Sequence, residues 1–467
     1  MGRPPREAVA VDLNDTNIDP ADPKYRRMLD NLQGNVLKPH GRKESDHLVL
    51  RFTGDPAAVR AWIRGFARDE VTSARTQIEA ATAFRGRGAP GGMFVNLYVS
   101  ATGYASIGID TGAFGPAGAS FRNGMKHREF SLLARNRDPV PSDWEEPYQG
   151  RIDALVALAD DSATAVAAKA QQVSQGLAGI ATVLTVERGT VLRNANGEPI
   201  EPFGYIDARS QPLFLKDDID RERQDGVDRW DPSAPLGLVL VDDPHTDVED
   251  SVGSYFVFRK LRQDVEGFNA QVTALATRLG VTEPLAGALV VGRFKDGTPV
   301  TLQANKGRGA FNNFTYLPDD PTGNRCPFHA HIRKANQRGA NAALGLAEER
   351  KRRILRRGIP YGIRPPVSGE VGLLFQAFQS DISRQFEFIQ RTWVDNPNFP
   401  EFRILPGLNT GDDALIGQHP RAVQRWPRDW GRSGRFIGRR LFNFGDHVRL
   451  RGGEYFFTPS LSFLRAL

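Results

Sequence analysis

Two histidines spaced two residues apart, His329 and His331, lie in the stretch 326–334 of a 467-residue chain that contains eight histidines. Their neighbours are apolar: Phe328, Ala330 and Ile332. Such neighbours indicate that part of the stretch is buried. A buried, neutral imidazole is a good axial ligand for the iron of haem. The stretch is therefore a candidate iron site in a chain otherwise poor in metal ligands.

Other interpretations of this stretch remain open. A histidine beside apolar residues is often a packed core residue. Residues i and i+2 of a strand share one face, so His329 and His331 could both point inward. Cys326 raises the possibility of zinc, but no fourth ligand stands at metal-binding spacing. No Cys-x-x-Cys-His motif is present, so covalent attachment of haem is not supported.

Asp207 and Arg356 could complete a site that cleaves peroxide. Peroxide must lose a proton from one oxygen and regain it on the other, and one carboxylate can carry that proton. A fixed guanidinium would stabilise charge on the departing oxygen. Alternatively, Asp207 is a turn residue beside glycine and proline, and Arg356 lies on the solvated face of a helix that ends before Gly358.

The composition limits the remaining possibilities. Hydrophobic residues make up 40% and charged residues 25% of the chain, which is typical of a globular protein. The net charge of +6 is mild for this length and comes without a nucleic-acid-binding motif, so we expect no nucleic acid partner. One cysteine excludes an intrachain disulfide, and no secretory signal or run of 18 apolar residues appears. We therefore expect a cytoplasmic protein with no membrane partner.

The hydrophobic pattern predicts strands that alternate with helices. Helices are expected at 25–29, 57–67, 163–175, 264–279 and 382–392. Strands are expected at 47–52, 93–99, 152–159, 181–187, 236–241, 253–259, 372–378 and 454–457. Leu373 and Phe375 alternate on one of these strands, so they either form the wall of a pocket or pack in the core.

The order strand, turn, helix occurs near residue 47 and again near residue 253, which indicates two related halves. We predict an α+β fold of two ferredoxin-like domains, each an antiparallel sheet with helices. Residues 1–25 are expected to form a flexible N-terminal arm, 26–215 the first domain and 216–467 the second.

Several stretches resemble the dye-decolorizing peroxidases, a family of haem peroxidases. The matching stretches occur in order: 31–36, 203–212, 253–264, 324–336, 356–362, 372–393 and 451–457. The resemblance implies two ferredoxin-like domains, with haem b bound non-covalently and mainly by the C-terminal domain. It also implies hydrogen peroxide and a one-electron reductant, such as a dye or a phenol, as partners.

The resemblance assigns roles to individual residues. The proximal ligand falls on His331, the distal acid–base on Asp207 and the distal arginine on Arg356. His329 would lie close to haem, at a propionate, and Leu373 and Phe375 would wall the pocket. A carboxylate is expected at the far ring nitrogen of His331, and Glu387 and Asp381 are candidates for it.

Two residues depart from the family pattern. Ala208 stands where the Gly-x-x-Asp-Gly motif has its last glycine, which would cost about 1 kcal/mol if the position needs a positive φ. Gln337 replaces a proline and should affect only a loop. The Ala208 change supports an alternative function, a haem carrier, sensor or iron-release protein with weak peroxidase turnover. The reductant and the oligomeric state are left open by the sequence.

Overall fold

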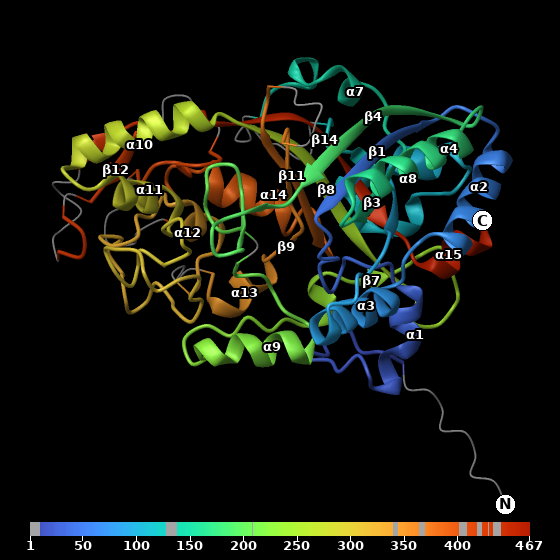
Figure 1. The fold of residues 1–467 in the computed structure, drawn as a ribbon, viewed down its shortest axis with the longest axis horizontal. Helices are drawn as coiled ribbons and strands as arrows, with labels where there is room; N and C mark the ends of the chain where they lie inside the picture. Colours follow the sequence, from blue (N-terminus) through green and yellow to red (C-terminus); the bar gives the residue numbers. More distant parts are fainter. Residues whose placement is uncertain are drawn as a thin grey trace, which may run out of the picture.

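A computed structural model describes residues 10–467 except 128–137, 208, 340–343, 364–368, 401–408, 418–422, 428 and 433–439. Antiparallel strands from both halves of the chain form one central sheet, and helices surround it (Figure 1). The predicted α+β fold is confirmed. Within the described residues no single helix has the length and apolar composition of a membrane span. The helices α10 (Val265–Leu279) and α11 (Glu283–Val291) reach it only together, across a 108° bend.

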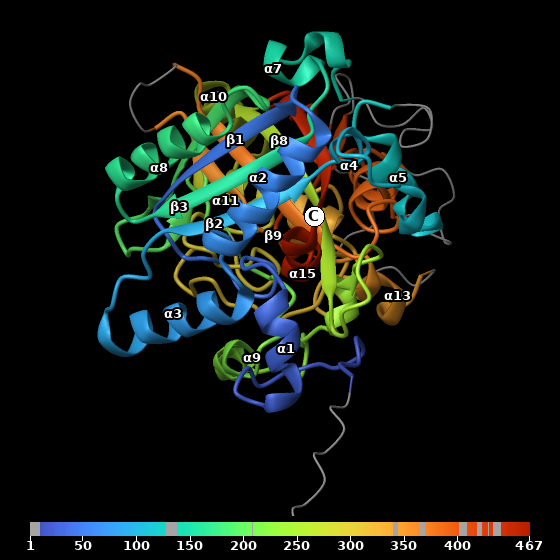
Figure 2. The same ribbon diagram turned by 90° about the vertical axis from the view of Figure 1, so that its right-hand side faces the viewer.

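The first half forms one ferredoxin-like unit. Its elements are β1 (Glu44–Phe52), α2 (Pro56–Asp69), α3 (Ala74–Arg87), β2 (Phe94–Val99), β3 (Ala154–Asp160), α8 (Ala163–Gly176) and β4 (Ala181–Thr190). The strands pair antiparallel in the order β2-β3-β1-β4. Asp55 caps α2 ahead of Pro56, and Ser162 caps α8, as their sequences favour. Figure 2 shows α2 and α8 lying over the outer face of these strands.

The second half repeats this order. Its strands are β8 (Val252–Gln263), β9 (Leu355–Arg356), β10 (Ile359–Tyr361), β11 (Gly372–Gln379) and β14 (Val448–Thr458). β14 pairs with β8, β8 with β11, and β11 with both β9 and β10. The fourth, first, third and second strands therefore lie side by side in each half, which is the ferredoxin-like order.

The two halves are joined through their edge strands. Phe457 of β14 pairs with Val99 of β2, and Tyr361 of β10 pairs with Gly189 of β4. Because β8 also pairs with β11, the strands close into a ring. The halves therefore share one sheet, and the domain boundary at 215/216 stays a prediction.

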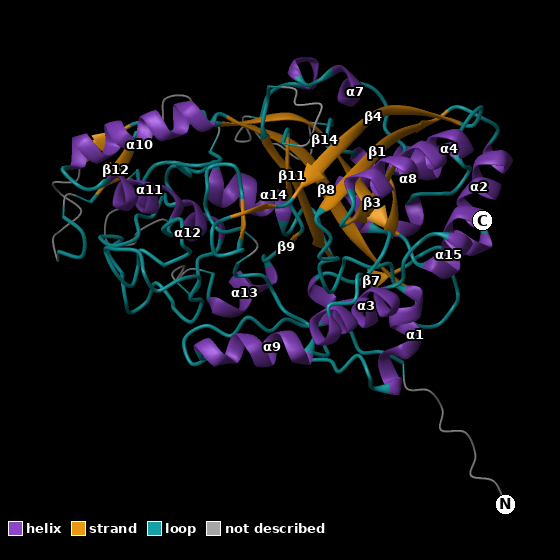
Figure 3. Cartoon of the chain, in the orientation of Figure 1, coloured by secondary structure: helices purple, strands orange, loops and turns teal. Residues whose placement is uncertain are grey.

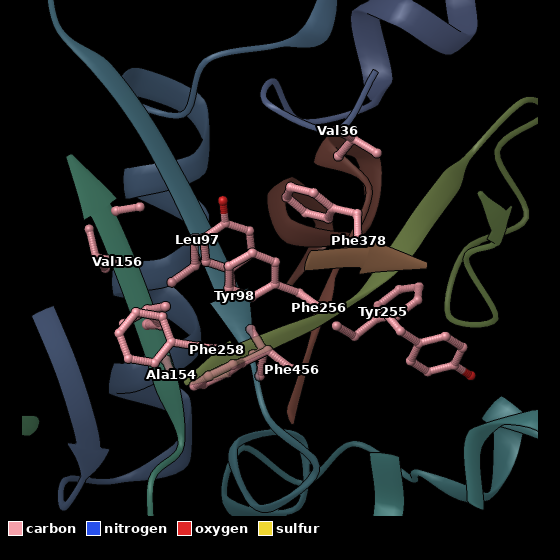
Figure 4. Close-up of a cluster of buried hydrophobic side chains, with 14 of the residues drawn as sticks. Val36, Leu97, Tyr98, Ala154, Val156, Tyr255, Phe256, Phe258, Phe378 and Phe456 are labelled. Atoms are coloured by element: carbon pink, nitrogen blue, oxygen red, sulfur yellow. The ribbon is translucent and has the colours of Figure 1, made fainter. Parts of the chain in front are cut away.

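Aromatic side chains from both halves fill the inner face of this ring (Figure 4). Phe256 of β8 stacks on Tyr98 of β2, with ring centroids 4.2 Å apart, and lies 4.8 Å from the ring of Phe378 on β11. His47 of β1 and Gln376 of β11 meet across the same interior at 3.0 Å. Packing inside the ring therefore depends on strands from both sequence halves.

The helices and long loops of the second half lie beside the ring (Figures 1 and 3). The helices are α10 (Val265–Leu279), α11 (Glu283–Val291), α12 (His331–Ala335), α13 (Leu346–Lys351) and α14 (Phe386–Phe388). Residues 292–330 between α11 and α12 form turns and loops without a regular helix or strand. α9 (Lys216–Glu222) connects the halves, and α1 (Pro23–Asn31) and α15 (Leu461–Ala466) lie near the chain ends.

Four sequence-based predictions of local structure are wrong. Ile18 is buried and bonded to Phe214, so residues 10–25 are not a loose arm, while residues 1–9 lie outside the described part. The apolar run 236–241 forms a short 3₁₀ helix, Leu236–Leu238, and then a two-residue strand, because an apolar run indicates burial rather than conformation. Arg356 lies in β9 rather than at a helix end, and His331 begins a helix rather than sharing a strand with His329.

The regular helix predicted at 382–392 is also incorrect in its details. Residues 382–385 form a turn, α14 is three residues long, and Ile389–Val394 adopts π-helical geometry. A π-helical segment often occurs at a functional site, and Ile389 and Gln390 line the cavity described below.

Replacement of Phe256 by alanine tests the shared core. Because the side chain is fully buried between both halves, we expect the substitution to lower the free energy of unfolding by about 3–5 kcal/mol, seen as a lower urea midpoint. Phe84→Ala is the control, since Phe84 is 56% exposed and its loss should change stability by less than about 0.5 kcal/mol. Equal midpoints for the two variants would contradict the shared core.

Candidate functional site

A cavity of about 240 Å³ lies between the ring of strands and the helices of the second half. Five of the predicted site residues line it: Asp207, His331, Arg356, Leu373 and Phe375. Most of the remaining lining residues come from the second half, and the loop 201–212 is the contribution of the first. The structure thus brings together three sequence motifs that are far apart in the chain.

The His331 ring is oriented by a buried carboxylate. Its Nδ1 lies 2.9 Å from Oδ2 of Asp413, which must accept the proton, so Nδ1 carries the hydrogen and Nε2 keeps a lone pair. Oδ1 of Asp413 accepts the backbone N–H groups of Leu415 and Ile416, at 2.8 and 2.9 Å. Because no described residue hydrogen-bonds Nε2 and His331 lines the cavity, that lone pair is available to a ligand.

Two buried cations hold α12 in place from the side away from the cavity. Arg333 donates to Oδ2 of Asp320 and to the carbonyl of Cys326, at 2.9 and 2.7 Å. Lys334 donates to the carbonyls of Asn396 and Phe399. His331 and Ile332, at the start of the helix, are thereby left on the cavity side.

His329 is not among the residues that line the cavity, and its place near a haem propionate stays a prediction. It is fully buried, its Nδ1 donates to the carbonyl of Thr410 at 3.0 Å, and its ring packs edge-on against Trp426. Its carbonyl accepts the N–H of Ala414 at 3.0 Å. His329 therefore fixes the segment that carries Asp413, which brings the carboxylate to His331.

Asp413 was not predicted from the sequence. The two candidates for its role lie elsewhere: Glu387 accepts bonds from Ser120 and Tyr455, and Asp381 accepts the N–H of Arg384. The zinc alternative also finds no support, because the described residues contain no cluster of three His, Cys, Asp or Glu side chains suited to a metal ion. Burial raises the pKa of the Cys326 thiol, which disfavours the thiolate that zinc requires.

Asp207 lies at the end of a tight hairpin loop. Ile200 and Ile206 form an antiparallel bridge, and the N–H of Asp207 donates to the carbonyl of Pro199 at 3.1 Å. Gly204 turns the chain with φ of +91°, a conformation that favours glycine. Ala208, the departure from the family motif, lies outside the described residues.

The segment that follows Asp207 fixes the position of Arg356 through hydrogen bonds. The guanidinium Nη2 donates to the carbonyl of Arg209 at 2.8 Å, and the Arg356 N–H donates to Oε1 of Gln211 at 3.1 Å. Arg209 is itself anchored by ion pairs to Glu222 and Asp225, at 2.6 and 3.0 Å. The loop with the acid therefore also fixes the arginine, and both groups line one cavity.

One wall of the cavity is a pair of neighbouring strands. Phe375 and Leu373 of β11 pair with Arg259 and Leu261 of β8, and all four side chains line the cavity because alternate residues of a strand share a face. Apolar side chains from the helices, such as Ile332, complete this lining. The lining is therefore suited to a mainly apolar ligand.

Arg293 and Arg338 are two of the buried arginines that give the lining a positive charge. Both donate to Oγ of Ser210 and Oδ1 of Asn312, and to backbone carbonyls. Burial lowers the pKa of Arg293 to about 9 and that of Arg338 to about 10, so both remain protonated at neutral pH. Neither forms an ion pair in the described part of the chain, and buried charges of one sign favour an anionic ligand.

Glu201 adds a carboxylate to the same cavity. Its oxygens accept the N–H groups of Phe203 and Tyr205, each at 2.9 Å, and the side-chain amide of Gln263 at 2.6 Å. Burial raises the pKa of Glu201 to about 7, and the charge of Asp207 adds to the rise, although the three hydrogen bonds oppose it. No pattern in the sequence points to this residue separately.

These features fit haem. The group is planar and largely apolar, its propionates are anionic, and its iron takes an axial imidazole. The cavity offers apolar walls, the guanidiniums of Arg293 and Arg338, and Nε2 of His331; among the described residues these guanidiniums form no ion pair and this nitrogen has no hydrogen-bond partner. The donor set in the cavity is therefore suited to an iron porphyrin rather than to a bare metal ion.

Comparisons with known proteins point the same way. The family profile "Dyp-type peroxidase, C-terminal" matches residues 225–401. The chain is 42% identical to the multifunctional dye peroxidase DyP2 of Amycolatopsis sp., covering 98% of this chain and all of that protein. The crystal structure of a DyP-type peroxidase from Anabaena sp. superposes with a TM-score of 0.89 at 42% identity, covering 97% of this chain and 98% of the other.

A more distant structure, a dye-decolorizing peroxidase in complex with 2,6-dimethoxyphenol, also superposes. Its TM-score is 0.73 at 25% identity, and the match covers 94% of this chain and 98% of that one. The likeness to these proteins extends over both halves of the chain.

The pKa of Glu201 makes stability depend on pH. A carboxyl whose pKa is raised by folding binds more protons in the folded than in the unfolded state, so the wild type loses stability as pH rises from about 4.5 to 7. Glu201→Gln removes this loss, worth up to about 3 kcal/mol. We expect the difference in melting temperature, variant minus wild type, to be larger at pH 8 than at pH 4.5. A difference that does not change with pH would contradict the raised pKa of Glu201.

Proposed function

The chain belongs to the dye-decolorizing peroxidase family, and we propose that it reduces hydrogen peroxide at a non-covalently bound haem b while oxidising dyes, phenols or other one-electron donors. One observation carries this proposal. His331, with a free Nε2, lines the same cavity as a carboxylate and a guanidinium, Asp207 and Arg356. The relative bound to 2,6-dimethoxyphenol supports phenols as donors.

His331 would hold the iron through Nε2. Its Nδ1–H bond to Asp413 fixes the ring and increases the electron donation of the imidazole. Arg293 and Arg338 would neutralise the propionates, which would explain why these two buried cations form no ion pair with a described carboxylate. Leu373 and Phe375 would pack against the porphyrin and exclude water from it. Haem, when bound, supplies the iron at which peroxide binds and the capacity to accept its oxidising equivalents.

Asp207 and Arg356 would act on the peroxide itself. A carboxylate oxygen of Asp207 would take the proton from one peroxide oxygen and return it to the other, which would leave as water. The guanidinium of Arg356 stabilises the negative charge that grows on that leaving oxygen. Because Arg209 and Gln211 fix Arg356 through the loop that carries Asp207, the two groups are presented to one bound molecule together.

Histidine variants test the iron ligand. We expect His331→Ala, supplied with haem, to lose or strongly alter the Soret band, because the Nε2 donor is gone. His329→Gln is the comparison variant: it removes the other histidine of the pair but keeps the backbone carbonyl that accepts from Ala414, and it should retain a Soret band. If His329→Gln loses the Soret band in ultraviolet–visible spectra and His331→Ala keeps it, the ligand is His329 instead.

Removal of the distal carboxylate tests the chemistry. We expect Asp207→Asn to bind haem normally but to react with hydrogen peroxide about 10²- to 10⁴-fold more slowly in stopped-flow measurements, because the proton carrier is lost. Asp217→Asn, at an exposed acid on α9, serves as the control and should match wild type. A wild-type protein that binds haem but does not react with peroxide would favour the alternative function of a haem carrier or sensor.

A further inference from the structure

A side chain, that of Glu201, connects the start of the loop that carries Asp207 to strand β8. Glu201 stands at the start of the loop, and its two oxygens bind the N–H groups on either side of Gly204. Backbone bonds between Glu201 and Tyr205, at 3.0 Å, and from Gly204 to the Glu201 carbonyl, at 2.8 Å, close the turn. Hydrogen bonds within residues 201–205 therefore fix the shape of the turn, independently of its contacts with the rest of the chain.

Glu201 is connected to strand β8 through Gln263. Its side-chain amide, on the last residue of β8, donates to Oε2 of Glu201 at 2.6 Å. In the part of the chain that the structure describes, no other hydrogen bond joins the 201–205 turn to β8. β8 also supplies Arg259 and Leu261 to the cavity wall, so this bond sets the position of the loop relative to the wall.

A buried carboxylate in this place is costly. It must be desolvated, and it stands close enough to a second carboxylate, Asp207, for their charges to repel. A neutral side chain that closed the turn would avoid both costs. A carboxylate therefore stabilises this hairpin less well than a neutral side chain would. This points to a role of Glu201 in the site rather than in folding alone.

We propose that Glu201 is a positioning residue for the distal acid: through Gln263 and the turn 203–205 it sets where the Asp207 carboxylate stands in the cavity. This inference rests on the proposed function, because it assigns a purpose to Asp207. Glu201 acts through Asp207 and does not itself touch the peroxide. It follows that the effect of removing Glu201 depends on Asp207 being present.

A double-mutant cycle tests this dependence. The haem-loaded wild type, Glu201→Gln, Asp207→Asn and the double variant are compared by their rate constants for reaction with hydrogen peroxide. In Glu201→Gln the amide keeps one acceptor oxygen and turns an N–H group toward a backbone donor. We expect this variant to react about ten- to a hundredfold more slowly, as a misplaced group does. In the Asp207→Asn background the same substitution should change the rate less than twofold.

Two controls accompany the cycle. Glu198→Gln changes a carboxylate three residues earlier, whose bond to Asn194 is local to its own turn, and should leave the rate within twofold of wild type. Gln263→Leu removes the donor on β8 and should slow the reaction in the same direction as Glu201→Gln. If Glu201→Gln fails to take up haem, Gln263→Leu replaces it in the cycle and is judged by the same criteria.

A readout independent of turnover is hydrogen–deuterium exchange of the haem-loaded proteins. We expect faster exchange of amides in the segment 201–207 in Glu201→Gln, with the wild-type rate in Glu198→Gln. The inference is overturned if Glu201→Gln exchanges and reacts like Glu198→Gln, or if its full rate loss persists in the Asp207→Asn background. An unchanged rate in Asp207→Asn alone would instead contradict the proposed function, so the two failures are distinguishable.

Discussion

The hydrogen bond from Nδ1 of His331 to Asp413 is the interaction on which the site depends. It selects the tautomer that leaves Nε2 free, and it fixes the ring at the start of α12. The carboxylate in turn is held by two backbone N–H groups and by the bond from Ala414 to His329. An imidazole without this partner could rotate or take the other tautomer, and the remaining cavity residues would have no fixed iron to act on.

The distal side of the cavity depends on the way the halves of the chain join. Asp207 follows the first ferredoxin-like unit, whereas Arg356 belongs to β9 of the second. The carbonyl of Arg209 and the side chain of Gln211 connect the two across that junction, and Glu201 connects the loop to β8. The closed ring of strands thus positions two reactive groups that neither half could place alone.

The sequence predicts well what local pattern determines. Most strands and helices of the two units follow from their apolar periodicity, and His331, Asp207 and Arg356 follow from their motifs. The partner of His331 does not, because Asp413 is 82 residues away in a loop without periodicity and is brought in by backbone bonds. Arg293 and Arg338 are missed for a related reason: arginine is usually exposed, and sequence alone does not reveal the folded cavity that buries them.

The position of the iron tests this account most directly. A crystal structure of the haem-loaded protein, with anomalous scattering recorded at the iron absorption edge, would locate it without reference to any assumed ligand. We expect one iron peak in the cavity, at coordination distance from Nε2 of His331, with the propionates toward Arg293 and Arg338. An iron bound by another residue, or a porphyrin outside this cavity, would contradict the assignment of the site.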